Sequence, residues 1–295
     1  MTSAPERLRK LLNSEGLIRA PGIHDGISAR LVERAGFPAA YVTGAGAAAS
    51  VIGRPDLGLL TMTEMAVHCH HLAGAVDIPL IADADTGYGN ALNVARTVRE
   101  YERSGVAGLH MEDQVFPKRC GHLPNKVVIP VEEFAAKIAS AVSARTDPDF
   151  VIIARTDARA PLGLRQAIER ANRYAEAGAD VLFVEAPQSM DEIEQIAAQV
   201  EAPLLINVIA KSDTPPVSME VLEELGYKVA IYPMVCMAAT YHATTAALDH
   251  LMRKGNDDMG SANLEPRELF ELVGLNEWLD QEKRFAQLAS AVDSN

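Results

Sequence analysis

The chain has 295 residues, of which 48% are hydrophobic, and a formal net charge of −13 at pH 7. A chain of this length can bury the core of one α/β barrel or of two domains, and its acidic balance argues against a nucleic-acid partner, because phosphate binding needs a concentrated basic face. No apolar run approaches the ~20 residues that a membrane helix needs, and three cysteines without a charged-then-apolar leader predict a reducing cytoplasm.

Short apolar runs, many of them β-branched, alternate with longer segments of helical pattern. In chain order the runs span residues 17–23, 39–44, 79–85, 108–113, 150–157, 181–186, 203–208 and 229–233. Eight such runs separated by spacers of helix length predict an α/β fold, the parallel (β/α)8 barrel. The runs are almost continuously apolar, which indicates that both faces of each strand are buried.

The spacers carry the helical period. Residues 164–176 place apolar side chains at helical spacing before Gly178, and residues 190–200 repeat the scheme. A doubly wound open sheet would give the same alternation. However, no Gly-x-Gly-x-x-Gly turn follows the first run, so the dinucleotide-binding version of that sheet has little support.

The residues after the last run are predicted to be helical. We treat residues 1–295 as a single barrel domain with residues 245–295 as its C-terminal helical extension. Two amphipathic patches lie in this extension, the first with Leu269, Phe270, Leu272 and Val273 and the second with Trp278, Leu279, Phe285 and Leu288. These patches could close the bottom of the barrel or reach a neighbouring subunit.

Polar residues end six of the predicted strands, at the rim where parallel barrels gather their catalytic residues. They are Tyr41 and Thr43 in the second run, Asp83 and Asp85 in the third, His110, Glu112 and Asp113 in the fourth, Arg155 and Asp157 in the fifth, Glu185 in the sixth and Asn207 in the seventh. We interpret Asp113 and Asp157 as caps of the following helices. The other residues predict a functional site at this rim.

Acidic residues in this set predict a metal site. Asp83 and Asp85 alternate along the third predicted strand, so their side chains are expected to leave the same face. With Glu112 and Asp56 they would form an all-oxygen cluster, which suits magnesium or manganese better than zinc. The alternative is that these acids pair with nearby arginine and lysine side chains, but the carboxylates outnumber those cations.

One cysteine lies in the motif Lys118-Arg119-Cys120-Gly121-His122. The pKa of a free cysteine is about 8.5, and neighbouring cations favour the thiolate, which makes the sulfur of Cys120 a usable proton donor or nucleophile near neutral pH. Gly121 lets the backbone bend closely around a ligand. The other two cysteines are distant in the sequence, which argues against a zinc knuckle.

Together these motifs resemble the isocitrate lyase / phosphoenolpyruvate mutase superfamily. The segments that carry the resemblance are 41–44 (Tyr-Val-Thr-Gly), 55–58 (Pro-Asp-Leu-Gly), 83–90 (Asp-Ala-Asp-Thr-Gly-Tyr-Gly-Asn), 112–114 (Glu-Asp-Gln), 118–122 (Lys-Arg-Cys-Gly-His) and 154–157 (Ala-Arg-Thr-Asp). Matching segments run from Pro21 to about the last barrel helix. Within the superfamily the chain is most similar to the 2-methylisocitrate lyase and 2-alkylmalate (2,3-dimethylmalate) lyase branch.

The resemblance implies a magnesium-dependent enzyme, with manganese as the alternative metal. It also implies a homotetramer in which C-terminal helices are exchanged between subunits. By the same resemblance Asp83 binds the metal directly, and Asp85, Asp56 and Glu112 act through water. The partner is a small carboxylate substrate, with neither nucleic acid nor membrane involved.

The resemblance also assigns the substrate and catalytic residues. Those that bind the pyruvate-like half of the substrate are Tyr41, Thr43, Gly44, Ala45 and Arg155, and those that line the rest of the pocket are His110, Gly121, Glu185 and Asn207. Cys120 would be the acid on a loop that closes over the site. The residues that would stabilise negative charge beside it are Lys118, Arg119 and His122.

These parts predict a carbon-carbon lyase. Collapse of a 2-alkoxide to a ketone breaks the neighbouring carbon-carbon bond and expels a carbanion, which Cys120 would protonate, leaving pyruvate and a carboxylate. The base that removes the hydroxyl proton stays open between Tyr41 and Glu112.

The substrate also stays open, because residues 208–216 and Ala238 depart from the methylisocitrate lyase pattern. That pattern has an acid and a glycine in the segment and an arginine at the position of Ala238. The alternatives are a carboxyphosphonoenolpyruvate-type phosphonomutase, an oxaloacetate hydrolase or decarboxylase, and a small-acid binding protein without turnover.

Overall fold

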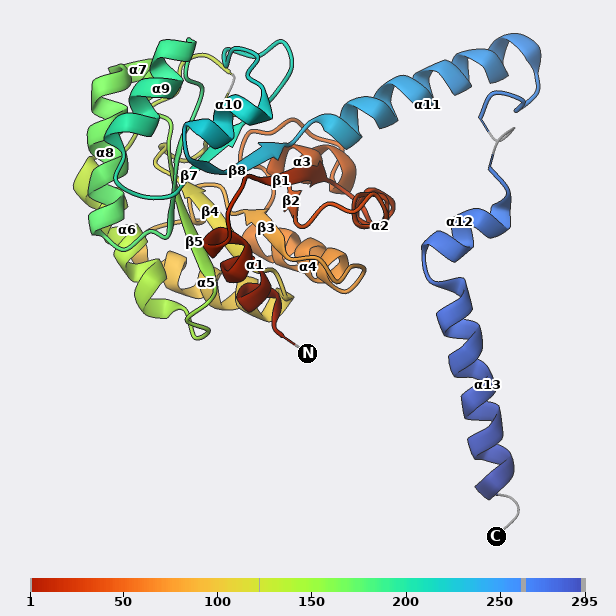
Figure 1. Ribbon diagram of the computed structural model, residues 1–295. Helices are drawn as coiled ribbons and strands as arrows, with labels where there is room; N and C mark the ends of the chain where they lie inside the picture. The colour runs from red at the N-terminus through yellow and green to blue at the C-terminus, as the bar shows by residue number, and fades with distance from the viewer. Residues whose placement is uncertain (1, 122, 261–263, 293–295) are drawn as a thin grey trace. The chain divides into compact units, whose positions relative to one another are not determined.

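The computed structural model describes residues 2–121, 123–260 and 264–292. Its first unit is built on a closed barrel of eight parallel strands that follow chain order (Figure 1). The strands are β1 (Ile18–Ile23), β2 (Ala40–Val42), β3 (Leu80–Asp83), β4 (Gly108–Glu112), β5 (Val151–Thr156), β6 (Val181–Val184), β7 (Leu204–Asn207) and β8 (Tyr227–Tyr232). The predicted (β/α)8 barrel is therefore confirmed.

Helices follow the strands and cover the barrel. They are α1 (Ala4–Asn13), α2 (Gly26–Arg34), α3 (Gly44–Val51), α4 (Met62–Ala73), α5 (Ala91–Ser104), α6 (Val131–Ala144), α7 (Arg159–Leu162), α8 (Leu164–Glu176), α9 (Met190–Gln199) and α10 (Met219–Glu224). The helix predicted over 164–176 is α8, and the helix predicted over 190–200 is α9, which ends one residue earlier.

Each predicted apolar run overlaps a strand, and the differences lie at the ends. The third run, 79–85, is shortened to β3 because Asp85 has a φ of +46°, which a strand residue does not adopt. The last run was expected at 229–233, but β8 already begins at Tyr227.

Two layers of apolar side chains hold the barrel together. Inside it, side chains such as Ile81, Ile153 and Val229 pack in one cluster with Leu8 and Leu12 of α1. The N-terminal helix therefore packs against the barrel interior. Between the strands and the outer helices lies a larger cluster, which includes the fully buried rings of Phe134, Phe150 and Tyr174. Burial on both faces explains why the strands read as continuous apolar runs.

The chain divides into two compact units, residues 1–237 and 238–295. The second unit contains most of α11 (Val235–Lys254), together with α12 (Pro266–Leu272) and α13 (Leu275–Val292). The two predicted amphipathic patches fall largely on α12 and α13, where Phe270, Trp278 and Phe285 are exposed. No helix in the described ranges has both the length and the apolar character needed to span a membrane.

Candidate active site

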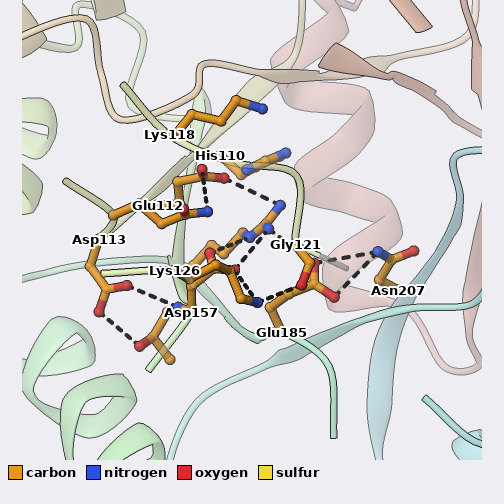
Figure 2. A network of polar contacts seen from close by, with 12 residues as sticks. His110, Glu112, Asp113, Lys118, Gly121, Lys126, Asp157, Glu185 and Asn207 are labelled. Carbon is orange, nitrogen blue, oxygen red and sulfur yellow. Dashed lines mark hydrogen bonds and ion pairs between the residues drawn. The ribbon is translucent and has the colours of Figure 1, made fainter. Parts of the chain in front are cut away.

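The carboxyl ends of neighbouring strands place buried polar side chains next to one another. In the barrel register Asp83 of β3 pairs with His110 of β4, and Glu112 of β4 pairs with Arg155 of β5. All four side chains are buried. Figure 2 shows His110 and Glu112 in this network. Polar residues at the rim predicted from the sequence are therefore neighbours in the structure.

A buried tyrosine and histidine stand beside Asp83. The hydroxyl of Tyr41 lies 2.6 Å from Nε2 of His110 and donates a hydrogen bond of 3.3 Å to Oδ2 of Asp83. Burial raises the pKa of Tyr41 well above its usual value and lowers the pKa of His110. At neutral pH a protonated phenol and a neutral imidazole therefore accompany this carboxylate.

The start of α3 forms the adjoining wall. The hydroxyl of Thr43 caps the helix by accepting from the amide of Gly46, and the next residues, Gly44 and Ala45, are in the first turn. A helix start presents unsatisfied amide groups that favour a carboxylate. A Cβ atom on Gly44 would lie 2.8 Å from Cγ of Asp83, so glycine permits this close approach. Tyr41 and Gly44, two of the residues predicted to bind a carboxylate, therefore lie against Asp83.

Asp83 and Asp85 do not project from one face of a strand, and that expectation is wrong. Strand β3 ends at Asp83, and the left-handed backbone of Asp85 turns the chain away. The two residues are instead joined locally, because the amide of Asp85 donates to Oδ1 of Asp83 at 2.9 Å. The carboxylates are brought together by a turn.

Lys118 lies among the acids predicted to hold a metal. Its ammonium group is 2.5 Å from Asp56 and 2.9 Å from Asp85. Burial lowers the pKa of Lys118, but Asp85, Glu112 and the other acids outweigh it and raise that pKa well above its usual value. The pairing of acids with cations that was weighed as the alternative is therefore present in the structure.

The acids differ in how readily they ionise. Burial disfavours the charged form of Asp83, but its interactions with His110, Lys118 and Arg155 outweigh burial and lower the pKa of Asp83 to about 2. Burial raises the pKa of Asp85 to about 6, against the opposing effect of Lys118. Burial likewise raises the pKa of Glu112 well above its usual value. Asp83 is thus the acid best suited to bind a cation directly.

The donor set fits magnesium. Asp56, Asp83, Asp85 and Glu112 offer only hard oxygen atoms, and an ammonium group already lies between two of them. Among the described residues no three acidic, histidine or cysteine side chains form a closed metal cage. Magnesium does not require one, since it usually takes one or two carboxylates and keeps several water molecules.

Arg155 connects the acids on its side of the pocket. Its guanidinium group lies 3.3 Å from Glu112 and 3.3 Å from Glu185, and it makes two hydrogen bonds to Asp157, of 2.9 and 3.1 Å. The amide of Asn207 in turn donates to Glu185 at 3.3 Å. Figure 2 shows Glu185 and Asn207 facing each other. Arg155, Glu185 and Asn207 therefore form one connected wall.

Asp113 and Asp157 are not helix caps, contrary to the sequence interpretation. The next helices, α6 and α7, begin after Pro130 and Ala158 without a side-chain cap. Asp113 is fully buried and accepts hydrogen bonds from Thr156, the amide of Asp157, Tyr174 and Arg170.

Asp157 binds a lysine that the sequence interpretation missed. Nζ of Lys126 donates to Oδ1 of Asp157 at 2.9 Å and to the carbonyl of Gly121 at 2.5 Å. Lys126 is buried, although it belongs to a polar loop that looks solvated in the sequence. Only an indirect signal in the sequence pointed to this lysine. Asp157 is a buried acid, and buried acids need cationic or hydrogen-bonding partners.

The cysteine motif packs against the wall formed by Arg155, Glu185 and Asn207. A Cβ atom on Gly121 would overlap the Arg155 guanidinium and lie 2.8 Å from Cγ of Glu185, so the main chain there packs directly on the pocket. Cys120 is half-buried, while Arg119 is exposed. The predicted catalytic residue His122 lies outside the described residues. The roles assigned to these residues from the motif remain predictions.

A family model described as phosphoenolpyruvate phosphomutase matches residues 8–252 of the chain. The protein belongs to this family. The superfamily inferred from the sequence motifs is therefore confirmed. Among curated relatives, 2,3-dimethylmalate lyase of Eubacterium barkeri is 43% identical over 284 residues, covering 95% of this chain and 97% of the relative. The 2-methylisocitrate lyase of Aeropyrum pernix is 42% identical over 283 residues, covering 96% and 90%.

Solved structures of other proteins share the whole fold of this chain. An oxaloacetate acetylhydrolase in complex with 3,3-difluorooxalacetate superposes with a TM-score of 0.93 at 38% identity, covering 96% of this chain and 97% of that one. A phosphonopyruvate hydrolase in complex with oxalate and Mg²⁺ gives 0.87 at 33% identity, covering 97% and 100%. Both curated relatives named above are lyases, which agrees with the predicted enzyme class.

Proposed function

We propose that the protein is a magnesium-dependent carbon-carbon lyase that cleaves a 2-hydroxy di- or tricarboxylate to pyruvate and a second carboxylate. The observation that carries this proposal is the packing of the cysteine motif on the acid-and-arginine pocket through Gly121. This packing brings the main chain next to Cys120 against a pocket whose other side offers carboxylates for a cation. Similarity to dimethylmalate and methylisocitrate lyases supports the same reaction class.

The chain's residues divide into two halves of a binding site. Asp83, assisted by Asp85, Asp56 and Glu112, would hold the magnesium ion, in keeping with the Mg²⁺ in the phosphonopyruvate hydrolase complex. Magnesium, when bound, polarises the hydroxyl and carboxylate of a 2-hydroxy acid and lowers the pKa of that hydroxyl. The first turn of α3, from Gly44, would bind the same carboxylate through its amide groups.

Proton transfers are assigned to the chain's own side chains. Breaking the carbon-carbon bond leaves negative charge beside the second carboxylate, and the thiol of Cys120 would supply the proton. Arg155 would orient the pyruvate-like half, because its guanidinium is held by Asp157 and Glu185. Two residues are candidates to receive the hydroxyl proton. Tyr41, whose phenol is protonated, would pass its own proton to the neutral imidazole of His110 at 2.6 Å, and Glu112 has a pKa raised by burial.

Release of a 2-oxo acid tests the proposal. Purified protein with magnesium is assayed against 2,3-dimethylmalate, 2-methylisocitrate, isocitrate and oxaloacetate. We expect turnover of one alkylated acid and loss of that turnover in the Cys120→Ser variant. If no acid in the panel yields a 2-oxo product while magnesium still binds, the lyase proposal is rejected.

Oxaloacetate hydrolysis is the second candidate. The oxaloacetate acetylhydrolase structure matches this chain with a TM-score of 0.93. In that reaction water adds to the 2-oxo carbon, the carbon-carbon bond breaks to give oxalate, and the departing acetate carbon still takes up a proton, which Cys120 would supply. Formation of oxalate and acetate from oxaloacetate, with no turnover of the alkylated acids, would favour this function over the lyase.

We further propose that the enzyme is a cytoplasmic homotetramer in which C-terminal helices are exchanged between subunits. In support, α12 and α13 carry exposed apolar side chains, including Trp278, Phe285 and Leu288. Burying such side chains against another copy would remove them from water. Light scattering on the full chain and on a Trp278→Glu, Phe285→Glu variant tests this assembly. A monomeric full chain would contradict it.

A further inference from the structure

The Cys120 loop, defined as residues 114–128, is closed at its base by main-chain pairing. Gln114 and Val128 form an antiparallel bridge, and the amide of Val115 donates to the carbonyl of Val127 at 2.8 Å. The carbonyl of Cys120 also accepts from the amide of Leu123 at 2.8 Å. The described part of the loop is thus anchored at its ends and near its tip.

The residue before the cysteine is held by Gln114. Nε2 of Gln114 donates to the carbonyl of Arg119 at 2.8 Å, and the amide of Arg119 donates to Oε1 of Gln114 at 3.1 Å. Both main-chain groups of Arg119 are therefore occupied by one side chain. Gln114 is buried and also donates to Oε1 of Glu112 at 2.9 Å, so it ties the loop to the acid cluster.

The residue after the cysteine is held by Lys126. Its ammonium group donates to the carbonyl of Gly121 at 2.5 Å and to Asp157 at 2.9 Å, and its side chain is only 2% exposed (Figure 2). Asp157 in turn accepts two hydrogen bonds from Arg155. Lys126 therefore ties the loop to Arg155 through the residue after Cys120, whereas Gln114 acts through the residue before it.

We propose that Gln114 and Lys126 are positioning residues that hold Cys120 between the acid cluster and Arg155 for proton transfer. They act through the main chain on the two sides of the cysteine. The inference rests on the proposed role of Cys120 as the acid. A main chain held at both neighbours limits how far the sulfur can move, and proton transfer is sensitive to displacements of about 1 Å.

A purely structural role for the same two side chains makes a different prediction. Buried polar groups need partners in any folded protein, so losing Lys126 could reduce stability without affecting Cys120. In that case the loss of turnover would be the same whether or not the thiol is present. Positioning predicts instead that the loss depends on the thiol, because non-additivity marks groups that act together.

The experiment compares Lys126→Met and Gln114→Leu in the wild-type and Cys120→Ser backgrounds of the full chain. Arg145→Met is the matched control, because Arg145 likewise donates to a carbonyl, that of Phe150 before β5, and to an aspartate, Asp180 before β6. We expect each test variant to lower kcat about 10- to 100-fold with KM changed less than about threefold, and to add little to Cys120→Ser. The control is expected to stay within about twofold.

A second measurement does not depend on turnover. Iodoacetamide alkylation of the peptide that contains Cys120 is followed by mass spectrometry, with oxalate and magnesium binding measured on the same samples. We expect Cys120 to be alkylated at least about fivefold faster in both test variants, with oxalate affinity kept, and at the wild-type rate in the control. Equal alkylation rates, or losses of kcat that add fully to Cys120→Ser, would overturn the positioning role. Failure of the lyase proposal alone would leave the alkylation difference in place.

Discussion

The ammonium group of Lys118 lies 2.9 Å from Oδ1 of Asp85, inside the set of acids expected to hold a metal. The same group is 2.5 Å from Asp56, and the Lys118 side chain is only 2% exposed. A divalent cation held as we propose would therefore depend on the same two carboxylates as the lysine. Since both are positive, each is expected to weaken the binding of the other.

Replacing Lys118 is therefore expected to tighten magnesium binding. Turnover should nevertheless be lost, because Lys118 is assigned to stabilise negative charge beside Cys120. Lys118→Met frees Asp56 and Asp85 and removes a repulsive charge, which predicts a magnesium affinity about five- to tenfold higher. Isothermal titration with magnesium chloride measures this affinity. In the wild type, a chelator should stop turnover and added magnesium should restore it. Weaker magnesium binding in Lys118→Met would show that the lysine supports the metal site.

Cys120→Ser is expected to lower kcat about 10²- to 10⁴-fold, the usual contribution of a general acid. A hydroxyl at this position is a much weaker acid than a thiol, but it is close in size, so magnesium and oxalate should bind as in the wild type. Single-turnover assays with quenching separate bond cleavage from product release. Full activity in this variant would remove Cys120 from the mechanism. Cys236→Ser, a half-buried cysteine elsewhere in the chain, is the control.

Gly44→Ala is expected to disable the site without unfolding the barrel. A Cβ atom at this position would lie 2.8 Å from Cγ of Asp83, so the carboxylate must move. We expect kcat/KM to fall about 100-fold, with little change in the thermal unfolding temperature because alanine favours a helix. The control is Gly26→Ala at the start of α2, where an added Cβ meets nothing within 4 Å. Equal activity in both variants would contradict the close packing of Gly44 on Asp83.

The buried acid Asp157 predicts a specific dependence of stability on pH. Burial alone would favour its neutral form, but Arg155 and Lys126 outweigh burial and hold the pKa of Asp157 well below its usual value. A carboxyl group whose pKa is lowered in the folded state contributes stability above its unfolded pKa, near ~3.9, and loses it as the pH falls below that value.

Asp157→Asn is therefore expected to destabilise the protein by about 3 kcal/mol at pH 7. The difference from the wild type should shrink below about pH 4, by up to about 1.4 kcal/mol per pH unit. Urea unfolding at a series of pH values from 7 down to 3.5 measures both quantities. A difference in stability that stays constant over this range would mean that Asp157 does not titrate with a lowered pKa.

The barrel and most of its rim could be predicted from the sequence because they follow from local patterns. Apolar runs such as 150–157 mark strands buried on both faces, and the polar residue that ends each run lies at the rim by geometry. Asp85 was misplaced because a left-handed backbone leaves no clear signal in the sequence. Asp113 and Asp157 were misread because an acid after a strand is more often a helix cap than a buried acceptor.

Lys126 was missed for a different reason. Its partners, Asp157 and the carbonyl of Gly121, lie 31 and five residues away along the chain, and only the folded loop brings them together. A single lysine in a polar segment has the same local pattern as a solvated one. Long-range pairing of this kind is a property of the tertiary structure, and it leaves no periodic pattern in the sequence.

The antiparallel bridge between Gln114 and Val128 closes the base of a segment inserted between β4 and α6. Its two ends leave and rejoin the barrel side by side, so its sequence can change without altering the strand register. Such an insert can be transplanted. A chimera that carries residues 115–127 from a relative of different activity would test how far this segment alone determines which reaction the enzyme catalyses.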